Sequence, residues 1–519
     1  MIRVNDPKVA TKENIMKPQR EQRKNLKVVH LNASSAGGAF VAAQRLSCAL
    51  NLLPEVESTH WVFEGGEGDF FLWADDWLKK KWAFALHALE KLDFLRFERE
   101  KAVRFAFSHG KTGVNVSAWE AIADADVIHL HWVNKGFIGL NGLEALLKLN
   151  KRVVWTCHDM WPFTGGCYHP RGCDHFQAGC GNCHYLKSPA DGDLSRRVFS
   201  AKQRMYQSHG GHLQFVTPSQ WLKDQALKSG ALTTNLRHGI QVIPNPIDTD
   251  YFYPARINVS GIEGIANEGI AKEGIAKEGI AKEGIAKEGI AKEGIAKEGI
   301  VIEGIANQGL GNDVGQGESV RGHIDRDDKA VSKTFTLMFA AANLGNAAKG
   351  FAEFRWVCNE LVARGFSQVE ALIVGENRIG DLGLKCKYRE LGFIKDAEQM
   401  REAYWQSDVY VTTSHEENLP TTIMESLSCG VPVAAFAVGG IPEMLVASGE
   451  HQTGFLVPKL GVRWGTTDIF MEQMVDELSN YIVSPESEVN HIKQNCREFA
   501  LQNYSANQIA LAYEQVYRA

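Results

Sequence analysis

The 519-residue sequence contains no apolar run long enough to cross a membrane, which takes about 20 consecutive residues. It also has no basic excess, because 62 Asp and Glu outnumber 56 Lys and Arg and the formal net charge is −6. Proteins that bind nucleic acid are usually basic, so we expect no nucleic-acid partner. Residues 1–25 are polar and lack the apolar core of a secretory signal, so we expect a cytoplasmic protein.

Cysteine is scarce, with ten in the whole chain, which argues against a scaffold built on disulfides. The fold must therefore depend on hydrophobic cores. A composition of 44% hydrophobic and 23% charged residues is ordinary for a globular protein. The length predicts two domains or more.

Short apolar segments alternate with helical patterns in two blocks. The segments lie at residues 26–32, 126–131, 152–156, 214–217 and 241–243, then at 335–340, 371–375 and around Val411 and Val433. Continuous apolar runs are typical of parallel strands covered by helices on both faces. The sequence therefore predicts an α/β protein with two doubly wound domains and a cleft between them.

Two carboxylates, Glu417 and Glu425, stand eight positions apart after the apparent strand at residues 408–414. Between them lie a short polar loop and the first turn of an apparent helix. Its residues are Leu419, Pro420, Thr421 and Thr422. A loop that leads from a strand into a helix N-terminus offers unpaired backbone N–H groups and a positive dipole. This segment is therefore a candidate site for phosphates and sugars.

The segment from Asp408 to Val433, with Glu-x7-Glu inside it, resembles the signature of family 4 (group 1) retaining glycosyltransferases of the GT-B fold. The resemblance implies two Rossmann-like domains that face a central cleft. It implies transfer of a hexose-like unit from a nucleotide-diphosphate sugar to a hydroxyl acceptor of a polysaccharide or a lipid-linked glycan. It also implies that Glu417 holds the donor sugar, that Glu425 holds the ribose hydroxyls, and that catalysis needs no cofactor.

The sequence divides into five parts. They are a polar tail (1–25), an N-terminal acceptor-side domain (26–252), an insertion (253–333), a nucleotide-sugar-binding domain (334–500) and a C-terminal helix expected to cross back to the N-terminal domain (501–519). The insertion holds six copies of Gly-Ile-Ala-Lys-Glu at residues 269–298. A period of five gives neither a helix nor a strand one apolar face, which favours a flexible segment. A partner-binding or oligomerising repeat is the alternative.

Further candidate site residues follow the first strands of the two blocks. Gly37 and Gly38 would let backbone N–H groups approach a diphosphate. No Gly-x-Gly-x-x-Gly is present, so a nicotinamide-binding interpretation is unsupported. Lys349 is expected to bind the donor phosphates. The resembled family usually carries an Arg about six residues earlier, where this chain has Asn343.

His158 and Asp159 follow a strand end, where α/β sheets bind ligands. The resemblance places His158 beside the reacting carbon and gives Asp159 the role of orienting it or touching the acceptor. With Glu417 they form the expected catalytic set. Ser219 and Asn245 lie in segments that resemble landmarks near the cleft.

Four cysteines lie within residues 167–183, in the pattern Cys-x5-Cys-x6-Cys-x2-Cys. They are Cys167, Cys173, Cys180 and Cys183. Such a set can bind a structural Zn²⁺, and two disulfides or four free thiols are the alternatives. Clustered cysteines of this kind also resemble a subset of these transferases linked to colanic-acid-like polysaccharides.

Residues 70–107 are rich in Trp, Phe, Leu, Lys and Arg. They suggest either an amphipathic surface that attaches to the inner face of the plasma membrane or a packed helical excursion. Two other functions stay open. One is a different GT-B enzyme, an epimerase or a phosphorylase. The other is a non-catalytic sugar-nucleotide-binding assembly protein.

Overall fold

The computed structural model describes residues 25–66, 68–255, 334–459 and 469–519, and both of its sheets belong to one compact unit. The expected tail at residues 1–25 and the insertion at 253–333 lie outside the described residues, apart from a few positions at their edges.

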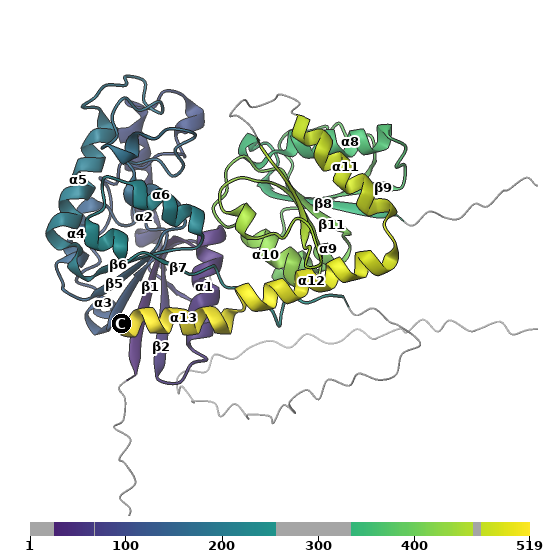
Figure 1. Cartoon of the computed structure of the whole chain (residues 1–519). Helices are drawn as coiled ribbons and strands as arrows, with labels where there is room; N and C mark the ends of the chain where they lie inside the picture. The colour runs from purple at the N-terminus through teal and green to yellow at the C-terminus, as the bar shows by residue number, and fades with distance from the viewer. Residues whose placement is uncertain (1–24, 67, 256–333, 460–468) are drawn as a thin grey trace, which may run out of the picture. The chain divides into compact units, whose positions relative to one another are not determined.

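The first sheet has seven parallel strands in the order β3-β2-β1-β4-β5-β6-β7 (Figure 1). Its strands are β1 (Leu26–Ser34), β2 (Val56–Glu64), β3 (Phe71–Leu72), β4 (Val127–Leu130), β5 (Arg152–Thr156), β6 (Leu213–Thr217) and β7 (Gln241–Val242). The helices between them are α1 (Gly38–Leu50), α2 (Trp77–Leu95), α3 (Glu120–Asp124), α4 (Leu140–Leu147), α5 (Leu194–His209), α6 (Gln220–Lys228) and α7 (Thr234–His238).

The second sheet has six parallel strands in the order β10-β9-β8-β11-β12-β13. They are β8 (Phe335–Asn343), β9 (Val369–Glu376), β10 (Lys387–Gly392), β11 (Val409–Thr412), β12 (Val433–Phe436) and β13 (Gly454–Val457). The helices are α8 (Phe351–Ala363), α9 (Ala397–Trp405), α10 (Thr421–Ser428), α11 (Ile469–Val483), α12 (Glu486–Tyr504) and α13 (Ala506–Arg518).

The central strands explain why both sheets are parallel and covered. All four residues of β4, β11 and β12 are buried, so these strands contact helices on both faces. In each sheet the strand order reverses beside the first strand, at β1 and at β8, and ligands bind at such switch points. The predicted α/β class with two Rossmann-like sheets is confirmed.

The last helix, α13, packs against the first sheet (Figure 1). Its buried Tyr513 and Tyr517 share a hydrophobic cluster with Val28 of β1. The Tyr517 hydroxyl lies 2.7 Å from His129 Nδ1, and the Tyr513 hydroxyl lies 2.8 Å from the Thr156 hydroxyl. The C-terminal residues therefore complete the core under β1, β4 and β5.

Candidate functional site

A cavity of about 360 Å³ lies where the C-terminal ends of strands from both sheets meet. It brings together nine residues that the sequence marked as candidates: Gly38, His158, Asn245, Lys349, Glu417, Leu419, Pro420, Thr421 and Thr422. Four other candidates, Gly37, Asp159, Ser219 and Glu425, are not among the residues that line it.

Lys349 reaches the cavity because the turn that carries it fits closely against the end of β11. Gly350, the next residue, has φ +75°, and a Cβ there would lie 1.9 Å from the Thr413 carbonyl oxygen, so only glycine fits. The Thr413 hydroxyl donates to the Gly350 carbonyl at 2.6 Å. The His415 amide donates to the Ala348 carbonyl at 2.8 Å. These contacts hold the backbone turn that carries Lys349.

Glu417 faces Lys349 across the cavity wall. The Lys349 ammonium lies 2.5 Å from Glu417 Oε1, and the Glu417 side chain is 14% exposed. The backbone at Glu417 lies close to Gly439. A Cβ at Gly439, whose φ is +57°, would lie 1.7 Å from the Glu417 carbonyl oxygen, so only glycine fits there. The cation that would meet a ligand phosphate is therefore paired with a carboxylate in this structure.

Two helices begin at the cavity. The first turn of α10 starts after Pro420, and no side chain caps it. The first turn of α1 starts after Gly37, whose φ is +91°, and it also lacks a side-chain cap. Helix N-termini carry partial positive charge and unpaired N–H groups. With the Lys349 ammonium, they give the cavity the features of an anion site.

A chain of histidines leads from the cavity into the first sheet. His158 Nε2 lies 3.1 Å from His131 Nδ1, and His131 Nε2 lies 3.0 Å from His30 Nδ1. Burial lowers the pKa of His158 to about 4 and holds the pKa of His131 and of His30 well below the usual range. All three rings are therefore neutral near pH 7.

Among the described residues, one group could place three ligand atoms around a metal, namely His30, His129 and His131. His129 Nδ1 already lies 2.7 Å from the Tyr517 hydroxyl, and its Nε2 lies 2.8 Å from the Thr156 hydroxyl. In this group, within the described part of the chain, only His30 Nε2 lacks a partner. We therefore interpret these rings as a hydrogen-bonded network and not as a metal centre.

Asp159 supports the loop beside His158 and does not line the cavity. Its Oδ1 accepts from the Trp161 amide at 2.8 Å, and its Oδ2 accepts from Trp132 Nε1 at 3.0 Å. Burial raises the pKa of its carboxyl group. Both oxygens thus hold the turn that follows β5, whereas the resemblance implied contact with the histidine or the acceptor.

Glu425, expected at the ribose, contacts Arg45 of α1. Arg45 Nη2 lies 2.7 Å from Glu425 Oε1, and the Tyr404 hydroxyl donates to Oε2 at 3.2 Å. Arg45 also stacks over the Phe252 ring at 5.2 Å. Sequence reasoning missed Arg45, because no motif surrounds it and its partner is 380 positions away.

Asn418 was also missed, although it lies inside the recognised signature. Its Oδ1 accepts from the Ser219 hydroxyl at 2.7 Å, and its Nδ2 donates to the His158 carbonyl at 3.2 Å. Nearby, Asn245 Nδ2 donates to the Leu419 carbonyl at 3.3 Å. Ser219 and Asn245 therefore act on the loop that carries Glu417, each through one hydrogen bond.

Two family models match the sequence. The model described as Glycosyltransferase Family 4 matches residues 94–251, and the model described as Glycosyl transferases group 1 matches residues 335–463. Residues 94–251 belong to the domain built on the seven-stranded sheet, and residues 335–463 belong to the domain built on the six-stranded sheet. Together they cover more than half of the chain.

Curated relatives match over parts of their length. WcaC of Escherichia coli K12, named as a colanic acid biosynthesis glycosyl transferase, is 29% identical over 102 residues, which are 19% of this chain and 25% of WcaC. The sulfoquinovosyl transferase SQD2 of Arabidopsis thaliana is 39% identical over 59 residues, 11% of this chain and 12% of SQD2. The chain thus spans a quarter or less of these two relatives.

Solved structures share the fold. Sucrose-phosphate synthase from Thermosynechococcus elongatus aligns with a TM-score of 0.53 at 14% identity, over 95% of this chain and 98% of that one. HepE from Anabaena, solved in complex with UDP, aligns with a TM-score of 0.51 at 14% identity, over 95% and 99%. From the matches to both of its domains, the chain belongs to the group 1, family 4 glycosyltransferases of the GT-B fold.

Proposed function

We propose that the protein transfers a sugar from a nucleotide-diphosphate sugar to a hydroxyl acceptor in polysaccharide or lipid-linked glycan synthesis, with retention of anomeric configuration. One observation carries the proposal. A single cavity gathers the Lys349 ammonium and the uncapped N-termini of α1 and α10 around the carboxylate of Glu417. This combination suits a diphosphate leaving group bonded to a sugar.

The donor diphosphate would replace Glu417 as the partner of Lys349. Its negative charge grows as the bond to the sugar breaks, and preorganised donors stabilise that charge without moving. Glu417, released from Lys349, would accept hydrogen bonds from the sugar hydroxyls. Retention would follow from attack on the face that the diphosphate leaves, with a leaving phosphate oxygen taking the acceptor proton.

The histidine chain would set the proton position of His158. A neutral imidazole has one donor and one acceptor nitrogen, so the three rings must donate in one direction. Donation from His158 toward His30 would leave a buried N–H at His30 Nε2 without an acceptor, and buried unpaired N–H groups are rare. The opposite direction puts the proton of His158 on Nδ1. His158 would then donate a hydrogen bond to the donor sugar or to the diphosphate.

A donor screen tests this function. Purified protein is incubated with common nucleotide sugars, and release of nucleoside diphosphate is measured. We expect slow release from one donor, and a rate about 10²–10³-fold lower in Glu417→Gln and in His158→Ala. The surface variant His212→Gln serves as the control and should match the wild type. Conversion of a nucleotide sugar to its epimer would identify an epimerase in place of a transferase. Consumption of inorganic phosphate with a sugar polymer would identify a phosphorylase.

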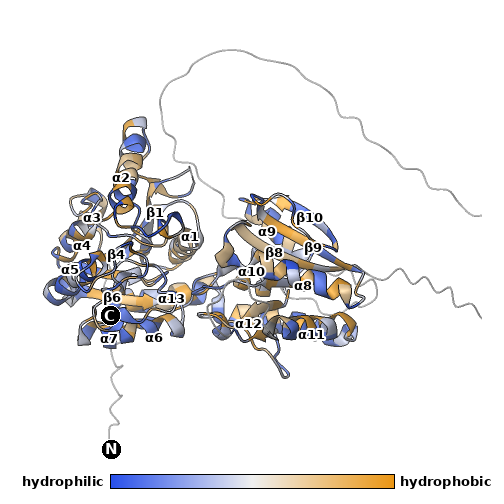
Figure 2. Cartoon of the chain, turned by 90° about the horizontal axis from the view of Figure 1, so that it is seen from above, coloured by the Kyte–Doolittle hydropathy of each residue, from blue (hydrophilic) through white to orange (hydrophobic). Residues whose placement is uncertain are grey.

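We also propose that α2 attaches the protein to a membrane that holds its acceptor. Among the described residues no helix is long and apolar enough to span a membrane. The buried stripe of α2 is formed by Ala83, Leu86, Glu90 and Phe94. On other sides of the helix, Leu78 is 69% exposed, Phe84 72% and Leu92 62%. Apolar and polar segments alternate along this helix (Figure 2).

Basic residues accompany this apolar surface. Lys80 and Lys81 are exposed on α2, and the Lys81 ammonium lies 3.8 Å from the centre of the Trp77 ring. Exposed Trp and Leu beside Lys are typical of helices that lie in a membrane interface and favour anionic lipids.

Sedimentation with vesicles tests the attachment. We expect binding to vesicles that contain phosphatidylglycerol and much weaker binding to pure phosphatidylcholine. Leu89 is 52% exposed on the same helix. Leu89→Glu and Leu92→Glu should each lower the binding constant about tenfold, because each removes an inserted apolar side chain. Leu227→Glu, which changes an exposed leucine on α6, should bind as the wild type does. Equal binding by all these proteins would exclude α2 as the attachment surface.

A further inference from the structure

The four clustered cysteines surround one small void. Cys167, Cys173, Cys180 and Cys183 all line a cavity of about 20 Å³, which is room for one water molecule or one metal ion. None of the four is in a disulfide. Four sulfur ligands around a single space are the donor set of a structural zinc site.

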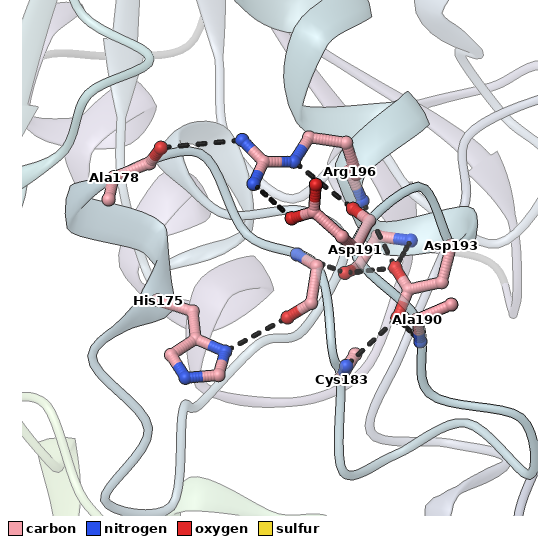
Figure 3. Close-up of polar contacts among 9 residues, drawn as sticks. His175, Ala178, Cys183, Ala190, Asp191, Asp193 and Arg196 are labelled. Carbon is pink, nitrogen blue, oxygen red and sulfur yellow. Dashed lines mark hydrogen bonds and ion pairs between the residues drawn. The ribbon is translucent and has the colours of Figure 1, made fainter.

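Side chains from outside the Cys-x2-Cys pair form hydrogen bonds with the backbone around it (Figure 3). Asp193 accepts from the Cys183 amide at 2.9 Å and from the Ser195 amide at 2.9 Å, at the start of α5. His175 Nδ1 lies 2.9 Å from the Gly181 carbonyl oxygen. Cys180 has a φ of +60° and Asn182 a φ of +49°, so the backbone between the two cysteines forms a tight turn. The contact with Gly181 occupies one ring nitrogen of His175. His175 and His184 also line the void, and His184 Nε2 has no hydrogen-bond partner among the described residues.

A buried cation beside the cysteines has no carboxylate partner within the described part of the chain. Lys202 is fully buried, and its ammonium donates to the carbonyls of Trp161 and Thr164. Burial lowers the pKa of its ammonium to about 7, and the charges of Cys167, Cys180 and Asp159 oppose that shift. Negative charge nearby therefore favours the protonated amine. Zn²⁺ with four thiolates carries two negative charges, and it would place that negative charge next to Lys202.

We propose that Cys167, Cys173, Cys180 and Cys183 bind one Zn²⁺ as thiolates. On binding, the four thiols release four protons, no electron is transferred, and no coordination position remains for water. Among the described residues no three of these sulfurs lie within 4.8 Å of one another, so the sulfurs must approach one another when the ion binds. The ion is structural.

The zinc site would fix one wall of the donor cavity. Between the first two ligands, Cys167 and Cys173, the chain supplies His169, which lines the cavity. It also supplies Arg171, whose Nε lies 3.4 Å from Glu416 Oε1, next to Glu417. Metal bonds would add to the packing that the buried Phe176, Tyr185 and Leu186 already give this loop.

Metal analysis of the full chain, purified without added metal or chelator, tests the proposal directly. We expect about one zinc per chain, released when a mercurial reagent titrates the loop thiols. Cobalt(II) exchanged into the site should give the intense visible bands of a tetrahedral cobalt thiolate. Cys183→Ser should lose those bands or shift them, and Cys48→Ser, an exposed cysteine outside the loop, should leave the spectrum unchanged.

The zinc content and the cobalt spectrum of the wild type depend neither on transferase activity nor on the folding of a variant. Wild-type protein that binds neither zinc nor cobalt, with all loop thiols free to react, would overturn the proposal. An intact mass lower by the hydrogens of two disulfides would overturn it as well, and would assign the same cysteines to covalent cross-links.

Discussion

Replacement of Lys349 by alanine is expected to lower kcat/KM for the sugar donor about 10²–10³-fold. Lys349 is the one Lys or Arg among the described residues that line the cavity. The position where the family usually carries an arginine holds Asn343, whose side chain accepts from the Gly345 amide at 2.8 Å. A single ammonium and the helix N-termini must therefore stabilise the diphosphate charge. Steady-state kinetics with the accepted donor measures the effect.

Binding of free nucleoside diphosphate distinguishes the role of Lys349 from that of Glu417. Lys349→Ala should weaken this binding, because the phosphates lose their cation. Glu417→Gln should keep or strengthen it, because a carboxylate 2.5 Å from the ammonium no longer competes with the phosphates. Lys395→Ala, an exposed lysine of the same domain, should change neither binding nor turnover. Equal diphosphate affinity in Lys349→Ala and the wild type would show that the phosphates bind elsewhere.

Mild acid is expected to destabilise the protein strongly, because five histidines are held neutral inside the first domain. Burial lowers the pKa of His60 and of His158 to about 4 and keeps the pKa of His30, His129 and His131 well below the usual range. In the unfolded chain each pKa is about 6.5. Below that pH the unfolded chain binds protons that the folded chain does not. Each histidine then costs about 1.4 kcal/mol of stability per pH unit, until the pH approaches its folded pKa.

Urea unfolding at several pH values between 7.5 and 5.5 measures this proton uptake. Stability should be full above about pH 6.5 and should fall steeply below it, with about four to five protons taken up by the cluster on unfolding. His60→Gln should lower the uptake by about one proton, and His212→Gln, a surface variant, should not. A stability that is independent of pH over this range would contradict the neutral cluster.

The fold was predictable because its central strands are short, apolar and covered on both faces. β5 has the bounds expected from its run of apolar residues, and β11 and β12 flank the recognised signature. Four strands escaped prediction, namely β2, β3, β10 and β13. β2 mixes buried and exposed positions along its length, and β10 is an exposed edge strand. Neither shows the continuous apolar pattern of a covered parallel strand.

The site was only partly predictable, because sequence motifs mark chain segments and not the contacts between them. The candidate residues around Glu417 form one cavity wall, because they belong to one continuous loop and the helix turn that follows it. Glu425 lies one helix turn further and pairs with Arg45, and Asn418 bonds to Ser219. These pairs join residues that are roughly 200 or more positions apart. His30 in the middle of β1 and His131 just after β4 offered a visible signal, but their alignment appears only once β1, β4 and β5 are adjacent.

A crystal structure of the full chain with the donor identified by the screen tests the central claim most directly. We expect the diphosphate to lie within hydrogen-bond distance of Lys349 Nζ and of the first amides of α10. We expect the sugar to contact Glu417 and His158. A diphosphate bound outside the cavity, with the Lys349–Glu417 ion pair intact, would contradict the account.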